Sequence, residues 1–248
     1  MNNLVIDIGN SNIVIGIYTS DVKVYRFNTD SSKTSDEYYN MFINSFKDIK
    51  IDNVLISSVV PSLTNTIKYC FENRFNIIPK IVSPGYKSGI KVMTDNPKEV
   101  GSDLICGVSG ASKYSPSGIV IDLGTATKIS YYKDKVFKGV IIAPGIQISA
   151  RTLSNSASQL SEFSLQKPER IFGKNTVECL QSGIIYGHIA MLNGLIKMIE
   201  KELGKKLDIY LTGGLSYIVK NDVEFKFKYD PNLILDALNQ MIVRNEEC

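Results

Sequence analysis

The residues best suited to chemistry in this chain are carboxylates that directly follow short apolar runs. Asp7 ends one such run, and small polar residues come after it, namely Gly9, Asn10, Ser11 and Asn12. These residue types tolerate the backbone angles of a tight turn, and the amides of such a turn can approach phosphate oxygens closely. The segment therefore predicts either a phosphate-binding loop or an ordinary solvated turn. One copy of the pattern does not choose between them.

A second segment near the middle of the chain repeats this plan. Asp122 follows the apolar run 119–121, and Leu123 with the small residues 124–127 leads into another apolar run at 129–132. The two aspartates lie almost half a chain length apart, so we interpret the repeat as an internal duplication. Two such hairpins with inward carboxylates can hold a nucleotide with its metal ion, and the second copy therefore favours function for both turns.

A third carboxylate, Asp103, lies in the first turn of a helix predicted after the loop 96–102. An acidic residue at this place complements the positive end of the helix dipole. A carboxylate at the mouth of a nucleotide cleft can also accept a proton from an attacking alcohol. The spacing leaves both roles open. The glycine pair 213–214 is equally open, because it suits both a close approach to a base or ribose and a plain strand-to-helix turn.

The elements that must position these carboxylates alternate between strands and helices, which predicts an α/β fold with a mostly parallel or mixed sheet. In the first half we expect a hairpin at 4–18, a helix at 35–46 begun by Ser35 or Asp36, and a buried strand at 53–60. The second half begins with another hairpin at 119–132. Because Ser, Pro and Gly occur together at 114–118, we expect one domain at 1–115 and a second at 116–248.

A long helix is predicted in the second half, capped by Asn175 and ended by Gly204. Its apolar side is expected to contain Leu180, Ile184, Met191, Leu195 and Met198 or Ile199. After it we expect a strand at 207–211, an edge strand at 224–229 and an amphipathic helix at 231–243. The lone His188 lies inside the long helix, where packing is a commoner role than catalysis.

Composition and charge argue against several classes of protein. The net charge of +3 comes from 28 basic and 25 acidic side chains without a long block of one sign, so no nucleic-acid partner is expected. The apolar runs are far shorter than the roughly 20 residues of a membrane span, and no export signal is recognised. Four scattered cysteines predict reduced thiols in the cytoplasm and no zinc site.

Two common nucleotide-binding signatures are missing. The chain has no Gly-x-Gly-x-x-Gly, and neither Gly173-Lys174 nor Gly204-Lys205 is followed by a hydroxyl residue as a Walker A motif requires. A P-loop enzyme and a Rossmann dehydrogenase are therefore not expected.

Taken together, these segments resemble type III pantothenate kinase, a family of the acetate and sugar kinase, Hsp70 and actin superfamily. The resemblance spans nearly the whole chain and rests on motifs at 7–12, 56–61, 96–103, 122–127, 139–145, 175–176, 182–183 and 212–214. It implies two duplicated actin-like, ribonuclease H-like domains with mixed sheets and a nucleotide cleft between them. It also implies ATP-dependent phosphorylation of pantothenate to 4'-phosphopantothenate, the first step of coenzyme A biosynthesis.

The resemblance also assigns roles to individual residues. It places ATP against Asp7, Ile8, Gly9, Asn10, Ser11, Asn12, Ile13, Val14 and Thr125. It places pantothenate against Gly101, Ser102, Asp103, Leu104 and Thr176, in a pocket formed by a homodimer. Asp103 is the implied general base, and Asp122 is the implied ligand of a monovalent cation. The implied cofactors are ATP, Mg²⁺ and K⁺ or NH₄⁺.

Two positions depart from the family's pattern. Leu104 stands where the family usually has an Arg that could meet a substrate carboxylate, and Lys128-Ile129-Ser130 stands where it often has Thr-x-Asp. Lys128 is a candidate to compensate for the missing Arg. The departures keep other functions open: a nucleotide-binding regulatory paralogue, a kinase for another small alcohol or sugar, or a phosphatase. An actin-like filament protein is less expected, because the chain is short for that class.

Overall fold

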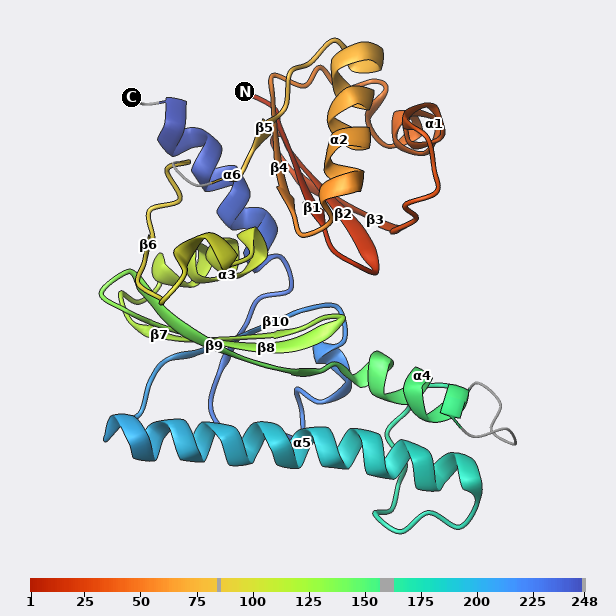
Figure 1. Ribbon diagram of the computed structural model, residues 1–248, viewed down its shortest axis with the longest axis vertical. Coiled ribbons are helices and arrows are strands. Elements are labelled where there is room, and N and C mark those ends of the chain that lie inside the picture. The colour runs from red at the N-terminus through yellow and green to blue at the C-terminus, as the bar shows by residue number, and fades with distance from the viewer. Residues whose placement is uncertain (84–85, 157–162, 247–248) are drawn as a thin grey trace. The chain divides into compact units, whose positions relative to one another are not determined.

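The computed structural model describes residues 1–83, 86–156 and 163–246 (Figure 1). The chain forms two compact units. The first contains Met1–Tyr114, Lys135–Phe137 and Asn232–Cys248, and the second contains Ser115–Asp134 and Lys138–Pro231. Each unit has a sheet and helices of its own.

The sheet of the first unit has the strand order β3-β2-β1-β4-β5. Its strands are β1 (Asn3–Ile8), β2 (Asn12–Tyr18), β3 (Val22–Asn28), β4 (Asn53–Ser58) and β5 (Lys80–Ile81). β1, β2 and β3 form an antiparallel meander, whereas β4 runs parallel to both β1 and β5. The predicted hairpin at 4–18 and the predicted strand at 53–60 are both present.

Alternate residues of β1 face opposite sides of this sheet, and each side carries a helical layer. Leu4, Ile6 and Ile8 are fully buried in a core shared with α1 (Ser35–Phe46) and α2 (Pro61–Cys70). Val5 lies in a second core with α3 (Ser102–Ser112) and α6 (Leu233–Glu246). Because both faces are covered, the strand ends are the exposed parts of the sheet where a ligand can reach backbone and side chains.

The second unit is built on β7 (Gly118–Leu123), β8 (Ala126–Lys133), β9 (Val136–Pro144), β10 (Ile209–Thr212) and β11 (Lys228–Tyr229), in the order β11-β10-β7-β8-β9. β7 and β8 form the predicted second hairpin, and β10 runs parallel to β7. The start of β9, which is counted with the first unit, pairs with the short strand β6 (Lys91–Val92). Of the predicted edge strand 224–229, only Lys228–Tyr229 is extended.

One side of this second sheet packs on α5 (Thr176–Leu203) and α4 (Ile146–Ser156). The Asn175 side chain accepts a hydrogen bond from the Glu178 amide, and Gly204 ends the helix with φ 65°, so both predicted ends of α5 are confirmed. The predicted apolar side faces the core, because Ile184 is buried and Met191, Leu195 and Ile199 pack against the same cluster, whereas Met198 is exposed. Polar side chains such as Gln181 and Asn193 are buried as well. Hydrogen bonds to backbone groups make that burial possible.

α5 is also long and apolar enough to cross a membrane, by length and composition alone. Core helices of soluble proteins pass the same test, and its buried residues belong to the core of the second unit. The remaining helical elements are short turns at Phe71–Phe75, Pro97–Glu99 and Ser216–Ile218.

The predicted division at 115/116 lies beside the first division that the structure makes, at 114/115. The predicted assignment of everything after 115 to the second domain differs from the structure at α6. Leu235, Leu238 and Met241 of α6 are buried against β1, β4 and α3, so this last helix completes the core of the first unit. Long-range packing of this kind leaves no local signal in the sequence.

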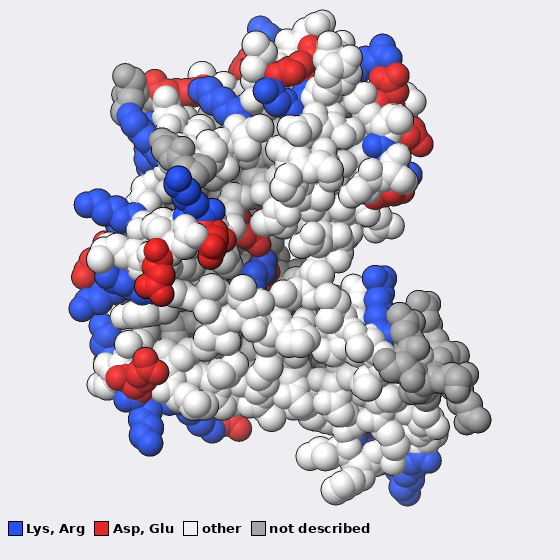
Figure 2. All heavy atoms as spheres, in the orientation of Figure 1, with Lys and Arg blue, Asp and Glu red and all other residues white. Residues whose placement is uncertain are grey.

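The surface carries charges of both signs. Figure 2 shows basic and acidic side chains interspersed on the face it presents. That face has no continuous field of one sign of the kind that follows a phosphate backbone.

Candidate functional site

Asp7 lies next to Ser57 at the end of the first sheet. The two residues are direct partners in the parallel register of β1 and β4, one residue before each strand ends at Ile8 and Ser58. The carboxyl ends of parallel strands form the edge of an α/β sheet at which ligands bind. The first predicted carboxylate therefore occupies a position suited to a ligand.

Ser102 attaches the start of α3 to this same edge. Its Oγ lies 3.0 Å from Ser57 Oγ, accepts a hydrogen bond from the Ser58 amide at 3.1 Å and donates one to the Ser58 carbonyl at 3.1 Å. These bonds hold the first turn of α3 at the ends of β1 and β4. Asp103, the next residue, is thereby brought to the edge that carries Asp7.

The buried Cys106 thiol lies one turn further along α3 than Ser102. Its pKa is raised well above the usual thiol value, first because the group is buried and then because the negative charges of Asp7 and Asp103 oppose a thiolate. A hydrogen bond with Ser57 acts in the opposite direction. Both carboxylates therefore act on the same buried atom, and Cys106 itself is kept neutral and unreactive.

The loop between β1 and β2 is fixed by hydrogen bonds that its carbonyl groups accept. The Gly9 amide donates to the Asn12 carbonyl at 2.9 Å and closes the turn. Thr29 then supports the loop from β3's end, because its hydroxyl donates to the Gly9 carbonyl at 2.6 Å and its amide to the Ser11 carbonyl at 3.0 Å. Asn10 and Asn12 remain exposed. The loop is thus fixed from one side while polar residues face solvent, as a phosphate-binding turn requires.

The second unit repeats this geometry around Asp122. Thr212 of β10 pairs with Asp122 of β7 in a parallel register, and the Leu215 amide donates to the Leu123 carbonyl at 3.0 Å. Gly213 between them has φ 96°, and a side chain there would place its Cβ 2.6 Å from Asp122 Oδ1. Only glycine lets the 212–214 turn pass so close to the carboxylate.

A second glycine brings another motif to the same turn. A Cβ on Gly145, just before α4, would collide with the carbonyl oxygen of Thr125, and it would lie 2.7 Å from the carbonyl oxygen of Gly124. Segments 122–127, 145 and 212–214 therefore meet in the second unit. The sequence places these three segments far apart, and the structure brings them together at one sheet edge.

The Lys128 side chain lies on the Asp122 carboxylate. The two residues are direct partners across β7 and β8, and Lys128 Nζ is 2.7 Å from Asp122 Oδ2. Both side chains are largely shielded, with 18% and 15% of their surfaces exposed. The sequence suggested Lys128 as a replacement for the Arg absent at Leu104, and the structure shows it paired with Asp122.

His188 is a packing residue, as predicted. Its Nε2 lies 2.8 Å from Thr127 Oγ1 in the buried layer between β8 and α5, and burial lowers the pKa of the imidazole. This bond ties the hairpin that contains Asp122 and Thr125 to α5.

The other predicted site residues lie at helix starts. Gly101 precedes α3, and Leu104 is half-buried in its first turn, with its amide donating to Asp103 Oδ1 at 2.8 Å. Thr176 is exposed as the first residue of α5, directly after its Asn175 cap. Asp7, the loop 9–12 and 102–103 therefore meet in the first unit, while Asp122 and Thr125 share one turn in the second.

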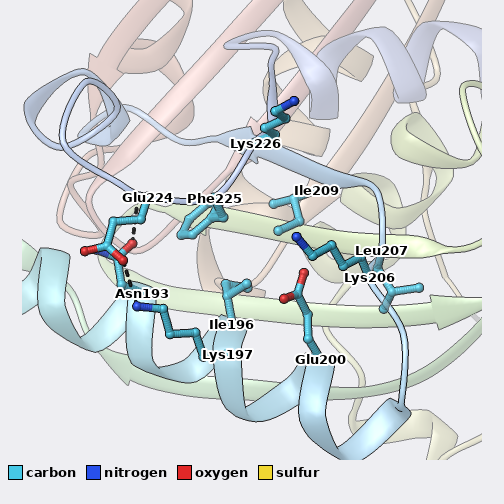
Figure 3. A pocket seen from close by; sticks show the side chains of 10 residues that line it. All are labelled: Asn193, Ile196, Lys197, Glu200, Lys206, Leu207, Ile209, Glu224, Phe225 and Lys226. Carbon is cyan, nitrogen blue, oxygen red and sulfur yellow. Dashed lines mark hydrogen bonds and ion pairs between the residues drawn. The ribbon is translucent and has the colours of Figure 1, made fainter.

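A separate pocket in the second unit is unrelated to these residues. It lies between α5 and the segment 224–226, with Asn193, Lys197, Lys206 and Phe225 in its lining (Figure 3). Ile209, which starts β10, also lines it, whereas Thr212 at the other end of the same strand pairs with Asp122. Three residues of extended chain span roughly 10 Å, so the pocket lies at the opposite end of the strand from the Asp122 turn.

The role of Ser57 was missed by the sequence reasoning, although 56–61 was recognised as a motif. The sequence does contain a pattern that could have indicated this role. Two predicted buried strands each end in a small or acidic polar residue, and a turn or loop follows each of them. Parallel neighbours place such residues side by side at one sheet edge.

The chain is similar to known proteins over nearly its whole length. A family model described as type III pantothenate kinase matches residues 3–198. The type III pantothenate kinase of Acholeplasma laidlawii is 38% identical over 245 residues, which cover 98% of each chain. The protein of the same description from an Exiguobacterium species is 37% identical over 254 residues, with 98% of this chain and 99% of the relative covered.

Solved structures agree on the fold. A Campylobacter jejuni protein described as a conserved Baf family transcriptional activator superposes with a TM-score of 0.63 at 22% identity, covering 99% of this chain and 100% of its own. The ethanolamine utilization protein EutJ of Carboxydothermus hydrogenoformans has a TM-score of 0.55 at 11% identity, covering 98% of this chain and 89% of its own. Component A of the (R)-2-hydroxyglutaryl-CoA dehydratase of Acidaminococcus fermentans has a TM-score of 0.55 at 14% identity, covering 96% and 95%. The predicted actin-like α/β fold with mixed sheets is confirmed.

Proposed function

This chain belongs to the type III pantothenate kinase family, and from that premise we propose that it transfers the γ-phosphoryl group of ATP to the primary hydroxyl of pantothenate. The product is 4'-phosphopantothenate, and the reaction is the first step of coenzyme A biosynthesis. The observation that carries the proposal is the pair of carboxylates, Asp7 and Asp103, held at the carboxyl ends of β1 and β4 in a chain similar to these kinases over its whole length.

In this proposal the first hairpin binds the triphosphate. The loop 9–12 offers backbone amides and small polar side chains, and its support by Thr29 keeps it in place without the ligand. Residues 7–14 and Thr125 are the proposed ATP contacts, and the cleft between the two domains stays a prediction. Phosphoryl transfer asks little covalent chemistry of a protein, so positioning and charge neutralisation supply most of the rate.

Magnesium fits the residues around Asp7. The strand-end carboxylate is a hard oxygen ligand, and Mg²⁺ is usually bound by one or two carboxylates together with phosphates and waters. Within the described residues, no group of three or more His, Cys, Asp or Glu side chains converges. When bound, the ion neutralises charge on the phosphates, and Asp7 is the residue proposed to hold it directly or through water.

Asp103 is the proposed general base. Its carboxylate would accept the hydroxyl proton of pantothenate as the oxygen attacks phosphorus. The three bonds of Ser102 to β4 fix the turn that carries it, which keeps the base in place during the attack. Gly101, Ser102, Leu104 and Thr176 are proposed to contact the acceptor.

A second copy of the chain is the proposed partner. The second unit exposes large apolar side chains around α4 and the start of α5, namely Ile142, Ile148, Leu153, Ile171, Phe172 and Val177. α4 and α5 are packed together, and Ser182 of α5 is hydrogen-bonded to the Ile171 carbonyl, so these segments are neighbours. Such an apolar surface suits a homodimer.

We place the enzyme in the cytoplasm, where its free thiols Cys70, Cys106 and Cys179 stay reduced.

Leu104 supports one alternative. Without the Arg, a pantothenate carboxylate loses a bidentate partner at this position, so a different small alcohol, or nucleotide binding without turnover, is the competing function. ADP release with pantothenate, with related alcohols and with no acceptor separates these cases. The proposal expects release that depends on pantothenate and formation of phosphopantothenate detected by mass spectrometry. ATP binding without turnover of any acceptor would overturn it in favour of a regulatory role.

A further inference from the structure

The contact between Lys128 and Asp122 is built into the second hairpin. The two residues face each other across β7 and β8, where opposed side chains lie about 5 Å apart at their Cβ atoms. The ammonium then reaches the carboxylate at 2.7 Å, with less than a fifth of either side chain exposed. The pair is therefore positioned by the strand register, unlike an exposed surface pair whose long side chains must be ordered by the contact itself.

The two oxygens of Asp122 have different neighbours. Oδ2 is occupied by Lys128 Nζ, while Oδ1 faces the backbone of the 213–214 turn, so close that a Cβ on Gly213 would lie 2.6 Å away. The same strand end is followed by Thr125, a proposed ATP contact. A positive charge fixed on Asp122 consequently lies beside a turn that is proposed to contact ATP.

A monovalent metal ion does not fit this arrangement. The family resemblance implies K⁺ or NH₄⁺ at Asp122, and K⁺ requires several oxygen ligands at the place it occupies. Here one carboxylate oxygen already holds an ammonium group, which would repel a second cation of the same charge. NH₄⁺ and the lysine –NH₃⁺ group carry the same charge and donate hydrogen bonds to the same acceptors.

We propose that Lys128 supplies, as part of the chain, the positive charge that a monovalent cation would supply at Asp122, so the enzyme works without K⁺. The inference rests on the proposed kinase function. A tethered ammonium is present at every turnover, whereas a free ion must bind from solution. The activity of this chain should therefore be insensitive to the choice of monovalent salt.

The test compares four salts at equal ionic strength, the chlorides of potassium, ammonium, sodium and tetramethylammonium, with Mg²⁺ and ATP held constant. Pantothenate-dependent ADP release by the wild-type protein should agree within about twofold in all four. Lys128→Thr, which introduces the hydroxyl residue common in the family, should lose about tenfold or more in sodium and recover in potassium. Lys133→Thr removes an exposed lysine from the same strand and should behave as wild type.

A stimulation of the wild-type protein by potassium of tenfold or more would overturn the inference, and so would a Lys128→Thr variant as active in sodium as wild type. If circular dichroism shows that the Lys128→Thr variant is unfolded, the Lys128→Gln variant is tested in its place. Thermal stabilisation by ATP with Mg²⁺ provides a readout without turnover, since it should depend on potassium in the variant alone. If no salt supports turnover with pantothenate, the proposed function fails, while the ATP-induced shift still decides the role of Lys128.

Discussion

At the scale of single residues, a hydroxyl contact in the first unit brings the proposed base to the same strand edge as the proposed phosphate loop. Ser102 bridges to Ser57 and Ser58, and the neighbouring Asp103 and Asp7 both act on the Cys106 thiol. None of these contacts lies in the turn motif itself. The role proposed for Asp103 therefore depends on Ser102, a residue that has no catalytic role of its own.

Asp103→Asn should keep ATP binding and lower kcat by about two to four orders of magnitude, because the amide cannot accept the hydroxyl proton. The measurement is steady-state ADP release with saturating pantothenate, together with calorimetric titration of ATP. Asp95→Asn, an exposed aspartate of the loop before α3, is the matched control and should leave kcat unchanged. Wild-type turnover in Asp103→Asn would remove this residue from the role of base.

At the scale of elements, two helices begin with the same kind of cap in very different places. Thr34 and Glu37 form a reciprocal capping box at α1, and Asn175 accepts from the Glu178 amide at α5. α1 packs Tyr38, Phe42 and Phe46 into the hydrophobic core of the first unit, whereas α5 starts at the proposed acceptor residue Thr176. The same loss of a cap should therefore have different functional consequences.

Thr34→Ala and Asn175→Ala should each lower the free energy of unfolding by about 1 kcal/mol, since each leaves a helix amide without its partner. Only Asn175→Ala should also raise KM for pantothenate, because the first turn of α5 would fray where Thr176 lies. Urea unfolding, followed by the helical circular dichroism signal, measures the change in the free energy of unfolding. Initial-rate kinetics measure the change in KM. Equal KM values in both variants would contradict a role for the α5 start in acceptor binding.

At the scale of the whole molecule, a buried histidine links the stability of the fold to pH. Burial lowers the pKa of His188 below 6.5, so the folded protein binds a proton less readily than the unfolded chain. The stabilisation is fully present above pH 6.5 and is lost as the pH falls from that value through the lower folded pKa. The bond to Thr127 links this loss to the hairpin that carries Asp122.

The free energy of unfolding should therefore fall as the pH is lowered from 7 to 5, with a contribution from His188 of at most about 1.4 kcal/mol per pH unit. His188→Gln, which keeps a polar group for Thr127 but does not titrate, should show a shallower decline over the same range. The free energy of unfolding is measured with urea at each pH for the wild-type protein and for the variant. The difference between the two profiles gives the contribution of the imidazole. Parallel profiles would show that His188 does not control acid stability.

Assembly is the other property of the whole molecule that the surface predicts. Phe172 is 88% exposed within the apolar surface around α4 and the start of α5, and burying such a side chain contributes about 1.5–3 kcal/mol. Phe172→Ser should therefore weaken the proposed homodimer by about tenfold or more in Kd. Ile78→Ser, at an 80% exposed apolar residue of the first unit, should not.

Sedimentation equilibrium over a range of concentrations measures this effect on folded protein, checked by its melting temperature. A wild-type protein that stays monomeric at all concentrations would contradict the dimer. Identical dissociation constants for both variants would place the interface elsewhere.

The local parts of this protein could be predicted from its amino-acid sequence. The Asp-x-Gly turns, the hairpins at 4–18 and 119–132, and the ends of α5 follow from turn residues, alternation and caps, which act within a few residues. The motifs also sufficed to recognise the family, to which the comparisons assign the chain.

The contacts between residues far apart in the chain could not be predicted and come from the fold. α6 joins the first unit, Ser102 binds the end of β4, and Gly145 approaches Thr125 because packing and strand order bring them together over long sequence separations. Local propensity contains no information on such contacts. Lys128 shows the difference most clearly: the sequence marked it as a departure from the family, and the register of β7 and β8 placed its charge on Asp122.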